Sequence, residues 1–163
     1  MDALHERTAV ELRDLLAVGE LTPTEVTEHF LDRVDRLNPQ VGAFVTVTPE
    51  RARKRAAELE EARAAGSGPS PTPGGLWGLP TGDKDLWNRA GVPTGFGSRA
   101  FAGLPPAEES DEIVRVLDGA GIVSLGKTTA PELGFPAYTE PVGVPPARTP
   151  WDLTRGAGGS SGG

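Results

Sequence analysis

The sequence predicts an α/β fold, in which helices pack on a sheet, and three observations support this prediction. The first third of the chain contains helices with recognisable caps, residues 43–47 read as a short strand, and a helix over residues 110–118 leads into the apolar strand 122–125. A helix that leads directly into a buried strand is typical of α/β proteins. At 163 residues the chain is long enough for one domain with a core of its own.

Three helices are predicted before the first connector. The first covers residues 8–19, where a Thr-x-x-Glu capping box begins it and a glycine ends it. The second covers residues 22–37, with the same box, a proline in its first turn and an apolar stripe at helical spacing. Asn-Pro at 38–39 is expected to stop it. The third, over residues 48–65, has a thin apolar face and is expected to be exposed.

Composition divides the chain into three parts. Residues 1–65 are the N-terminal helical region, residues 66–75 (GSGPSPTPGG) are a Gly/Pro/Ser connector, and residues 76–163 begin the α/β core. Glycine and proline cluster after residue 66, and a connector of this composition is flexible or extended. Residues 130–159 are expected to be mostly irregular for the same reason.

The charge and the rare residue types exclude several classes of protein. The chain has 16 Lys and Arg against 23 Asp and Glu, a net charge of −7, and an acidic chain without a basic stripe is a poor nucleic-acid binder. The absence of cysteine excludes disulfides, thiolate metal sites and a cysteine nucleophile. Only His5 and His29 are available, so neither a histidine triad, a metal site nor a cofactor is predicted. No signal peptide and no run of ~20 apolar residues is visible, which predicts a cytoplasmic protein away from membranes.

Residues 121–128 (GIVSLGKT) match the phosphate-loop pattern G-x-x-x-x-G-K-[ST]. In a true phosphate loop, backbone N–H groups surround the phosphates between a strand and a helix. Here a helix precedes the match, the residues Ile-Val-Ser-Leu prefer a strand, and Pro131 follows soon after. We therefore predict a buried strand followed by a turn, and only magnesium-dependent nucleotide binding would favour the phosphate-loop interpretation.

Two other segments carry residues suited to chemistry. In residues 78–85 (GLPTGDKD) Lys84 stands between two aspartates, and residues 155–163 (RGAGGSSGG) hold two adjacent serines between glycine pairs. Such glycines let a loop adopt strained geometry and present hydroxyl and N–H groups. Hydrolysis without histidine or cysteine needs another base, and a lysine can serve when burial keeps its amine neutral. Taken alone, Lys84 reads as a solvated loop cation and the serine segment as a flexible linker.

Taken together, these segments make the chain resemble the N-terminal portion of an amidase signature family protein. The matching stretches are residues 78–85, 92–98, 110–135 and 149–163, and the N-terminal helices are typical in style. The resemblance implies a mixed central sheet covered by helices, incomplete in this chain. It also implies a Ser–cis-Ser–Lys triad that hydrolyses amides.

The resemblance gives roles to particular residues. The lysine of the family's motif matches Lys84, and its bridging serine, which follows a cis peptide bond, matches Ser160. Ser161, Gly158 and Gly159 are implied as supporting or loop residues. The acyl-forming serine of the family lies further along, so the nucleophile is expected beyond the chain end.

Four residues near these motifs carry further expectations. A carboxylate close to Lys84 would favour the charged amine and oppose its role as a base. We therefore expect Asp83 and Asp85 to point away from it, toward backbone N–H groups. Thr129 and Leu133 stand where the family often has Asn and Phe, which affects the shape of the pocket and not the type of reaction.

The implied function is an amidase that hydrolyses a carboxamide C–N bond to a carboxylic acid plus ammonia or an amine. The partners implied are a small-molecule amide and a second copy of the chain. One alternative is the amidase subunit of a tRNA-dependent glutamine amidotransferase, which depends on partner subunits. The other is a non-catalytic truncated remnant. We expect the 163-residue chain alone to be inactive.

Overall fold

A computed structural model describes residues 3–72 and 74–163, so Pro73 of the predicted connector lies outside the described residues. The chain divides into two compact units, and each is assembled from three separate segments. Unit 1 contains Met1–Arg33, Thr48–Thr81 and Val116–Leu125, and unit 2 contains Val34–Val47, Gly82–Arg115 and Gly126–Gly163. Among the described residues, no helix has the length and apolar character needed to cross a bilayer.

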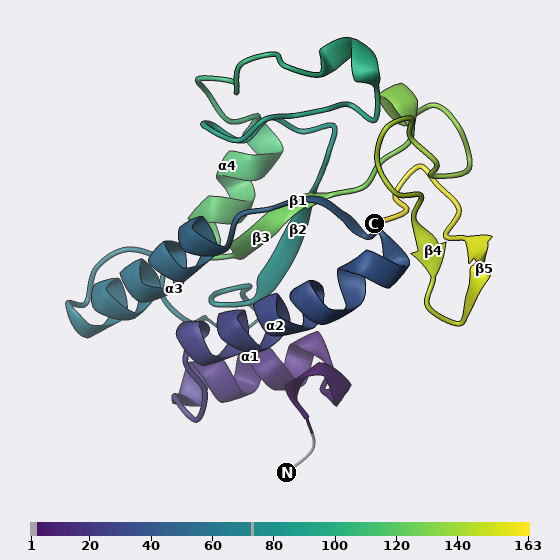
Figure 1. Cartoon of the computed structure of the whole chain (residues 1–163). Helices are drawn as coiled ribbons and strands as arrows, with labels where there is room; N and C mark the ends of the chain where they lie inside the picture. Colours follow the sequence, from purple (N-terminus) through teal and green to yellow (C-terminus); the bar gives the residue numbers. More distant parts are fainter. Residues whose placement is uncertain (1–2, 73) are drawn as a thin grey trace. The chain divides into compact units, whose positions relative to one another are not determined.

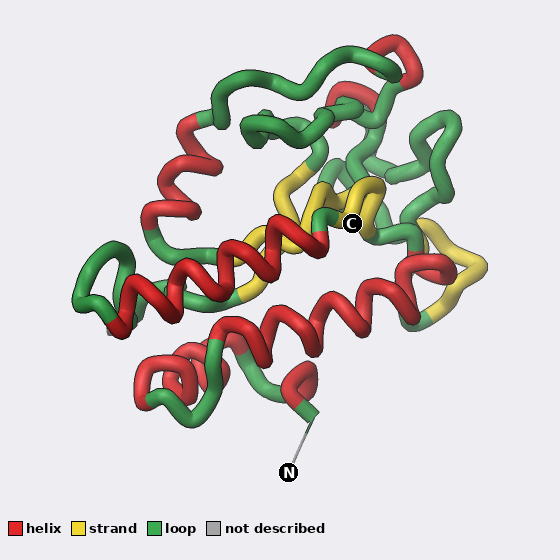
Figure 2. Tube along the Cα trace, turned by 60° about the vertical axis from the view of Figure 1, so that its left-hand side comes forward, coloured by secondary structure: helices red, strands yellow, loops and turns green. Residues whose placement is uncertain are grey.

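Unit 1 contains a 3-10 turn (Leu4–Glu6), helix α1 (Ala9–Val18), the first part of α2 (Pro23–Val41) and helix α3 (Pro49–Ala64). The capping box predicted for α1 is confirmed, because Thr8 Oγ1 accepts a hydrogen bond from Glu11 N at 3.2 Å and Thr8 N donates to Glu11 Oε2 at 2.7 Å. The bond from Thr8 N, together with one from the Thr8 hydroxyl to Glu11 Oε2 at 2.8 Å, lowers the pKa of Glu11. Gly19, at φ +80°, ends the helix. α1 lies beside the first part of α2 (Figure 1; Figure 2).

Helix α3 is largely exposed, as predicted, but one thin face of it is buried. Ala52, Ala56 and Leu59 are fully buried along one face, because alanine side chains let the helix approach its neighbours closely. Thr48 precedes the helix, but its side chain makes no capping hydrogen bond. Near the other end, Arg63 donates to two carbonyls at the end of α1, those of residues 16 and 17.

Helix α2 continues through Pro39 to Val41, which is four residues beyond the predicted stop. A proline in the last turn removes one N–H and leaves most of the helix bonds intact. The chain is turned instead by Asn38, whose side chain donates to Phe44 O at 2.9 Å and accepts from Phe44 N at 2.7 Å. This side chain therefore leads the chain into the first strand.

The predicted α/β class is confirmed by a three-stranded mixed sheet in the order β1-β3-β2. Its strands are β1 (Phe44–Val47), β3 (Val123–Thr128) and β2 (Pro80–Lys84). β1 is antiparallel to β3, with Phe44 opposite Thr128. The bonds from Val123 N to Leu79 O and from Asp85 N to Thr128 O advance in the same direction along both chains, so β2 and β3 are parallel. β3 is therefore the central strand.

Strand β3 extends three residues beyond its predicted end and includes Gly126, Lys127 and Thr128. These are the last three residues of the phosphate-loop match, and a strand cannot wrap its N–H groups around phosphates. The strand interpretation is confirmed. The turn expected directly after residue 125 is absent, because pairing with β1 continues to Thr128.

The segment expected to be irregular contains a hairpin. β4 (Arg148–Thr149) pairs antiparallel with β5 (Asp152–Gly156), drawn in yellow in Figure 1. Short 3-10 turns lie at Arg99–Phe101 and Glu132–Gly134, and helix α4 runs from Glu112 to Gly119. The hairpin leads directly into the glycine-rich residues that close the chain.

Candidate active site

The structure brings together the two residues predicted to be catalytic. Lys84 Nζ donates a hydrogen bond to Ser160 Oγ at 2.9 Å, although the residues are 76 positions apart. Lys84 is the last residue of β2, and Ser160 lies in the loop that follows β5. Both side chains are half-buried, so the pair has access to solvent on one side. An amine and a hydroxyl at this distance can exchange a proton.

The loop around Ser160 is fixed by glycine geometry and by one buried threonine. The peptide bond between Gly159 and Ser160 is cis, and Gly158 has φ +85°. Thr139 is fully buried, and its Oγ1 donates to Gly158 O at 2.6 Å. A Cβ at Gly159 would lie 3.1 Å from that same Oγ1, so a side chain there would be tight. Ser161 is exposed, and its hydroxyl has no hydrogen bond within residues 3–72 and 74–163.

The end of the loop is bonded to the chain just after β3. Gly163 N donates to Thr129 O at 3.0 Å, and Thr129 N donates to Ala43 O at 2.8 Å. The hydroxyl of Thr129 also donates to Gly42 O at 2.7 Å. Thr129 is buried with its hydroxyl and backbone groups hydrogen-bonded, and its carbonyl anchors the end of the serine loop.

The two acids that flank Lys84 are buried, with partners of their own. Successive residues of a strand point to opposite faces, so Asp83 and Asp85 leave β2 on the side away from Lys84. Asp85 accepts hydrogen bonds from the backbone N–H of Gly95 at 3.1 and 3.2 Å, as predicted. Asp83 also points away from Lys84, and it forms a two-point ion pair with the Arg89 guanidinium, which was not predicted.

A second lysine, Lys127 of β3, lies on the buried side of the sheet, near Asp85. Lys127 is 0 % exposed, and its ammonium lies 3.9 Å from Asp85 Oδ1. It donates to Thr94 Oγ1 at 3.1 Å and to the carbonyl of Trp87. Burial lowers the pKa of Lys127, and the nearby carboxylates of Asp85 and Asp83 oppose this effect. Burial likewise raises the pKa of Asp85, which the Gly95 N–H and Lys127 partly offset.

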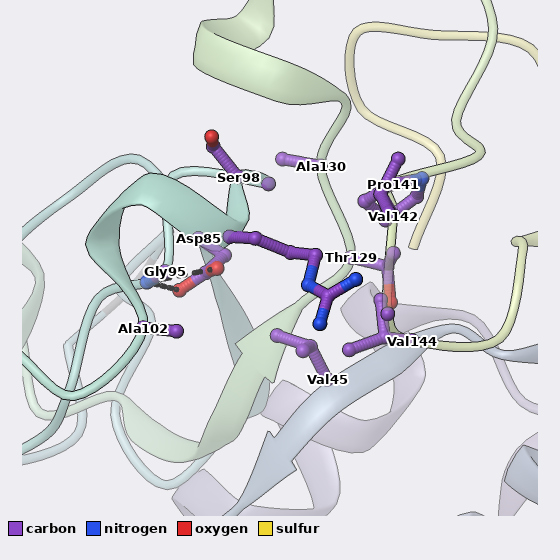
Figure 3. Close-up of a pocket in the computed structure, with 13 residues that line it drawn as sticks. Val45, Asp85, Gly95, Ser98, Ala102, Thr129, Ala130, Pro141, Val142 and Val144 are labelled. Carbon is purple, nitrogen blue, oxygen red and sulfur yellow. Dashed lines mark hydrogen bonds between the residues drawn. The ribbon is translucent and has the colours of Figure 1, made fainter.

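A cavity of about 280 Å³ lies beside the residues that follow β2, and Asp85 is one of the residues that line it. In Figure 3, Asp85 and Gly95 are joined by hydrogen bonds on one side, and Val45 and Val144 lie on the other. Arg99 also lines the cavity, whereas Lys84 and Ser160 do not. The described residues contain no cluster of three or more side chains suited to hold a metal.

A lysine amine that reaches a serine hydroxyl at the end of an α/β sheet defines a candidate serine–lysine hydrolase. The chain belongs to the amidase signature family, since the sequence model of the Amidase family matches residues 25–163. Its structure is similar to that of a bacterial aryl acylamidase of this family, with a TM-score of 0.86 and 31% identity over 96% of this chain and 32% of that one.

Curated relatives match the whole chain at higher identity. It is 40% identical over 163 residues to the glutamyl-tRNA(Gln) amidotransferase A subunit of Chloroflexus aggregans, and 41% identical to the corresponding protein of Salinispora arenicola. These matches cover 100% of this chain and 32% of each relative. The chain therefore spans about a third of the length of the curated relatives it matches.

Several residues of the site were not found by sequence reasoning. Arg89, Thr94 and Thr139 carry no motif of their own. Thr94 and Thr139 act through contacts with distant parts of the chain, and Arg89 acts through Asp83, six residues before it. Lys127 was noticed only as part of the phosphate-loop match. Its signal was a charged residue within a strongly apolar strand, where a buried partner is required.

Proposed function

We propose that this chain supplies the lysine and the bridging serine of a Ser–cis-Ser–Lys amidase, which hydrolyses a carboxamide to an acid plus ammonia or an amine. The observation that carries the proposal is the 2.9 Å hydrogen bond between Lys84 and Ser160, next to a cis peptide bond in a glycine-rich loop. Membership of the amidase signature family supports the same reaction. The proposed location is the cytoplasm, as expected from the sequence.

In the proposed mechanism Lys84 acts as the general base through Ser160. The neutral amine of Lys84 accepts the Ser160 proton, while Ser160 takes the proton of the nucleophilic serine expected beyond residue 163. That serine attacks the amide carbonyl and forms a tetrahedral intermediate. The relay then returns the proton to the leaving nitrogen, the C–N bond breaks, and water hydrolyses the acyl-enzyme.

The surroundings of Lys84 support its role as a base. Asp83 and Asp85 are paired on the buried side, and Lys84 has no ion pair with a carboxylate within the described part of the chain. A nearby carboxylate would stabilise the ammonium form and so oppose proton uptake. The two acids are therefore not placed to form an ion pair with Lys84.

Lys84→Ala tests the proposal in the longest reading frame that contains these 163 residues. We expect kcat/KM for an aryl amide to fall by about 10²- to 10⁴-fold, because the general base is lost. Ser160→Ala should cause a loss of similar size, and Lys54→Ala, at an exposed lysine, is the matched control. Turnover that survives Lys84→Ala within a factor of about three would overturn the proposed role.

A second candidate function is the amidase subunit of a glutamine amidotransferase, which frees ammonia from glutamine. The 40% and 41% identities to the A subunits of two glutamyl-tRNA(Gln) amidotransferases favour it. Glutamine hydrolysis that appears only after partner subunits are added would support this candidate. Turnover of simple amides without any partner would support the first.

A further inference from the structure

Lys127 is a buried cation that the proposed mechanism does not use. Its side chain is 0 % exposed, and the hydrogen-bond and ion-pair partners of its amine lie in the segment that follows Lys84. An ammonium group with no access to solvent is costly, and it persists only where several acceptors surround it. The position of this buried amine is therefore strongly determined by its neighbours.

The acceptors of Lys127 fix the turn directly after β2. Trp87 O is three residues from Lys84, and the same turn is closed by a bond from Trp87 N to Lys84 O at 3.0 Å. Thr94 Oγ1 belongs to the next loop and accepts from Lys127 at 3.1 Å. One ammonium group thus connects β3 to Trp87 and Thr94, two residues that lie outside the named strands.

The same end of β3 also holds the serine loop. Asp85 N donates to Thr128 O at 3.0 Å, which fixes the chain next to Lys84, and Gly163 N donates to Thr129 O at 3.0 Å, which fixes the loop of Ser160. The residue after Lys84 is therefore bonded to Thr128, and the end of the Ser160 loop is bonded to Thr129. Both of these acceptors come directly after Lys127. Any shift of the chain after β2 relative to β3 changes the distance between Lys84 Nζ and Ser160 Oγ.

We propose that Lys127 is a positioning residue, which ties the segment after Lys84 to β3 so that the lysine amine meets the Ser160 hydroxyl. The expected effect on catalysis rests on the proposed function. The expected effect on the hydrogen bond between Lys84 and Ser160 rests on the geometry alone. Lys127 does not touch substrate in this proposal. It acts through the backbone of Trp87 and the hydroxyl of Thr94.

Lys127→Met in the longest reading frame containing these residues tests the proposal. Methionine keeps most of the length of the side chain and removes its hydrogen bonds. We expect kcat to fall by about 10- to 100-fold with KM within about threefold, because a displacement of the order of 1 Å at a reacting pair costs that much. In a crystal structure of the variant, the distance from Lys84 Nζ to Ser160 Oγ should lengthen from 2.9 Å to more than about 3.5 Å, which breaks the hydrogen bond.

Thr94→Val gives a second test, because it removes one acceptor of Lys127 and preserves the shape of a half-buried side chain. It should lower kcat in the same direction by a smaller factor, even where Lys127→Met fails to fold. Lys54→Met is the matched control and should leave both kcat and the pair unchanged.

An unchanged Lys84–Ser160 hydrogen bond in the folded Lys127→Met variant overturns the positioning role, whatever happens to kcat. Where that variant does not fold, the same bond is examined in Thr94→Val, and an unchanged bond with unchanged kcat overturns it as well. A wild-type protein without amide turnover would refute the proposed function. The crystallographic distance would still decide the role of Lys127, so the two failures are distinguishable.

Discussion

The alternation of side chains along β2 decides which charges can reach Lys84. Asp83 and Asp85 are next to it in sequence, yet both leave the strand on the buried side, where Arg89 and Lys127 balance them. In a strand, Lys84 and its two acidic neighbours point to opposite faces. In a helix or an irregular loop, the same acids could lie next to the lysine. This separation depends on pairing the acids, since an unpaired carboxylate is rarely stable in a protein interior.

The ion pair of Asp83 and Arg89 gives a prediction at the residue scale. Arg89→Met should lower the free energy of unfolding by about 3–5 kcal/mol, because it leaves a buried carboxylate without its main partner. Denaturant unfolding measures this loss. Asp83→Asn in addition to Arg89→Met should recover part of it.

The matched control is Arg53, which forms a similar two-point pair with Glu28 but is about half exposed. Arg53→Met should cost much less, because solvent screens the exposed pair. Equal losses for the two arginine variants would show that burial does not determine the strength of the Asp83 pair.

At this scale the sequence identified Lys84 and Ser160, because each stands in a distinctive local motif. It could not identify Thr139 or Arg89, because neither belongs to a local motif and each acts through a side-chain contact that the fold creates. For the same reason it could not say that Asp83 would pair with a guanidinium. Contacts between side chains depend on the fold, and a local pattern does not contain them.

Among the elements, the helices were the easier part to predict. The capping boxes of α1 and α2 are both formed by local hydrogen bonds, those of Thr8 with Glu11 and of Thr22 with Glu25. Strand β2 was missed because its sequence, Pro-Thr-Gly-Asp-Lys, has low strand propensity. It is extended because it pairs with β3, which is tertiary information.

Helix α1 begins with a capping hydrogen bond and helix α3 begins without one, and this difference gives a prediction at the element scale. Thr8→Ala should lower the free energy of unfolding by about 1 kcal/mol, the usual cost of losing an N-cap hydrogen bond. Thr48→Ala, at the start of α3, should cost less, because that hydroxyl makes no capping bond and is buried without a partner. Chemical denaturation of both variants compares them directly. A larger loss for Thr48→Ala than for Thr8→Ala would contradict the assignment of the caps.

For the molecule as a whole, composition and contacts divide the chain differently. The predicted boundary near residue 65 rests on where glycine and proline begin to cluster, and it stays a prediction. The two compact units are each built from three segments, because the strands and helices of an α/β fold bring distant parts of the chain together. Composition along the chain cannot show that arrangement.

Unit 2 exposes an unusual set of aromatic side chains. Phe135 and Trp151 are each 94 % exposed, and Tyr138, between them in sequence, is 60 % exposed. Large exposed apolar groups of this kind favour association, because covering them removes apolar surface from water. We therefore predict that the 163-residue chain self-associates as its concentration rises.

Phe135→Ser combined with Trp151→Ser should weaken that association by at least about tenfold, since losing about 1.4 kcal/mol of burial is enough for such a change and each side chain can contribute more. Sedimentation velocity over a concentration series measures the effect. Val18→Ser is the control, because Val18 is 70 % exposed in unit 1 and is aliphatic. If the double variant associates as strongly as the wild type, or if Val18→Ser weakens association equally, the aromatic side chains of unit 2 are not its cause.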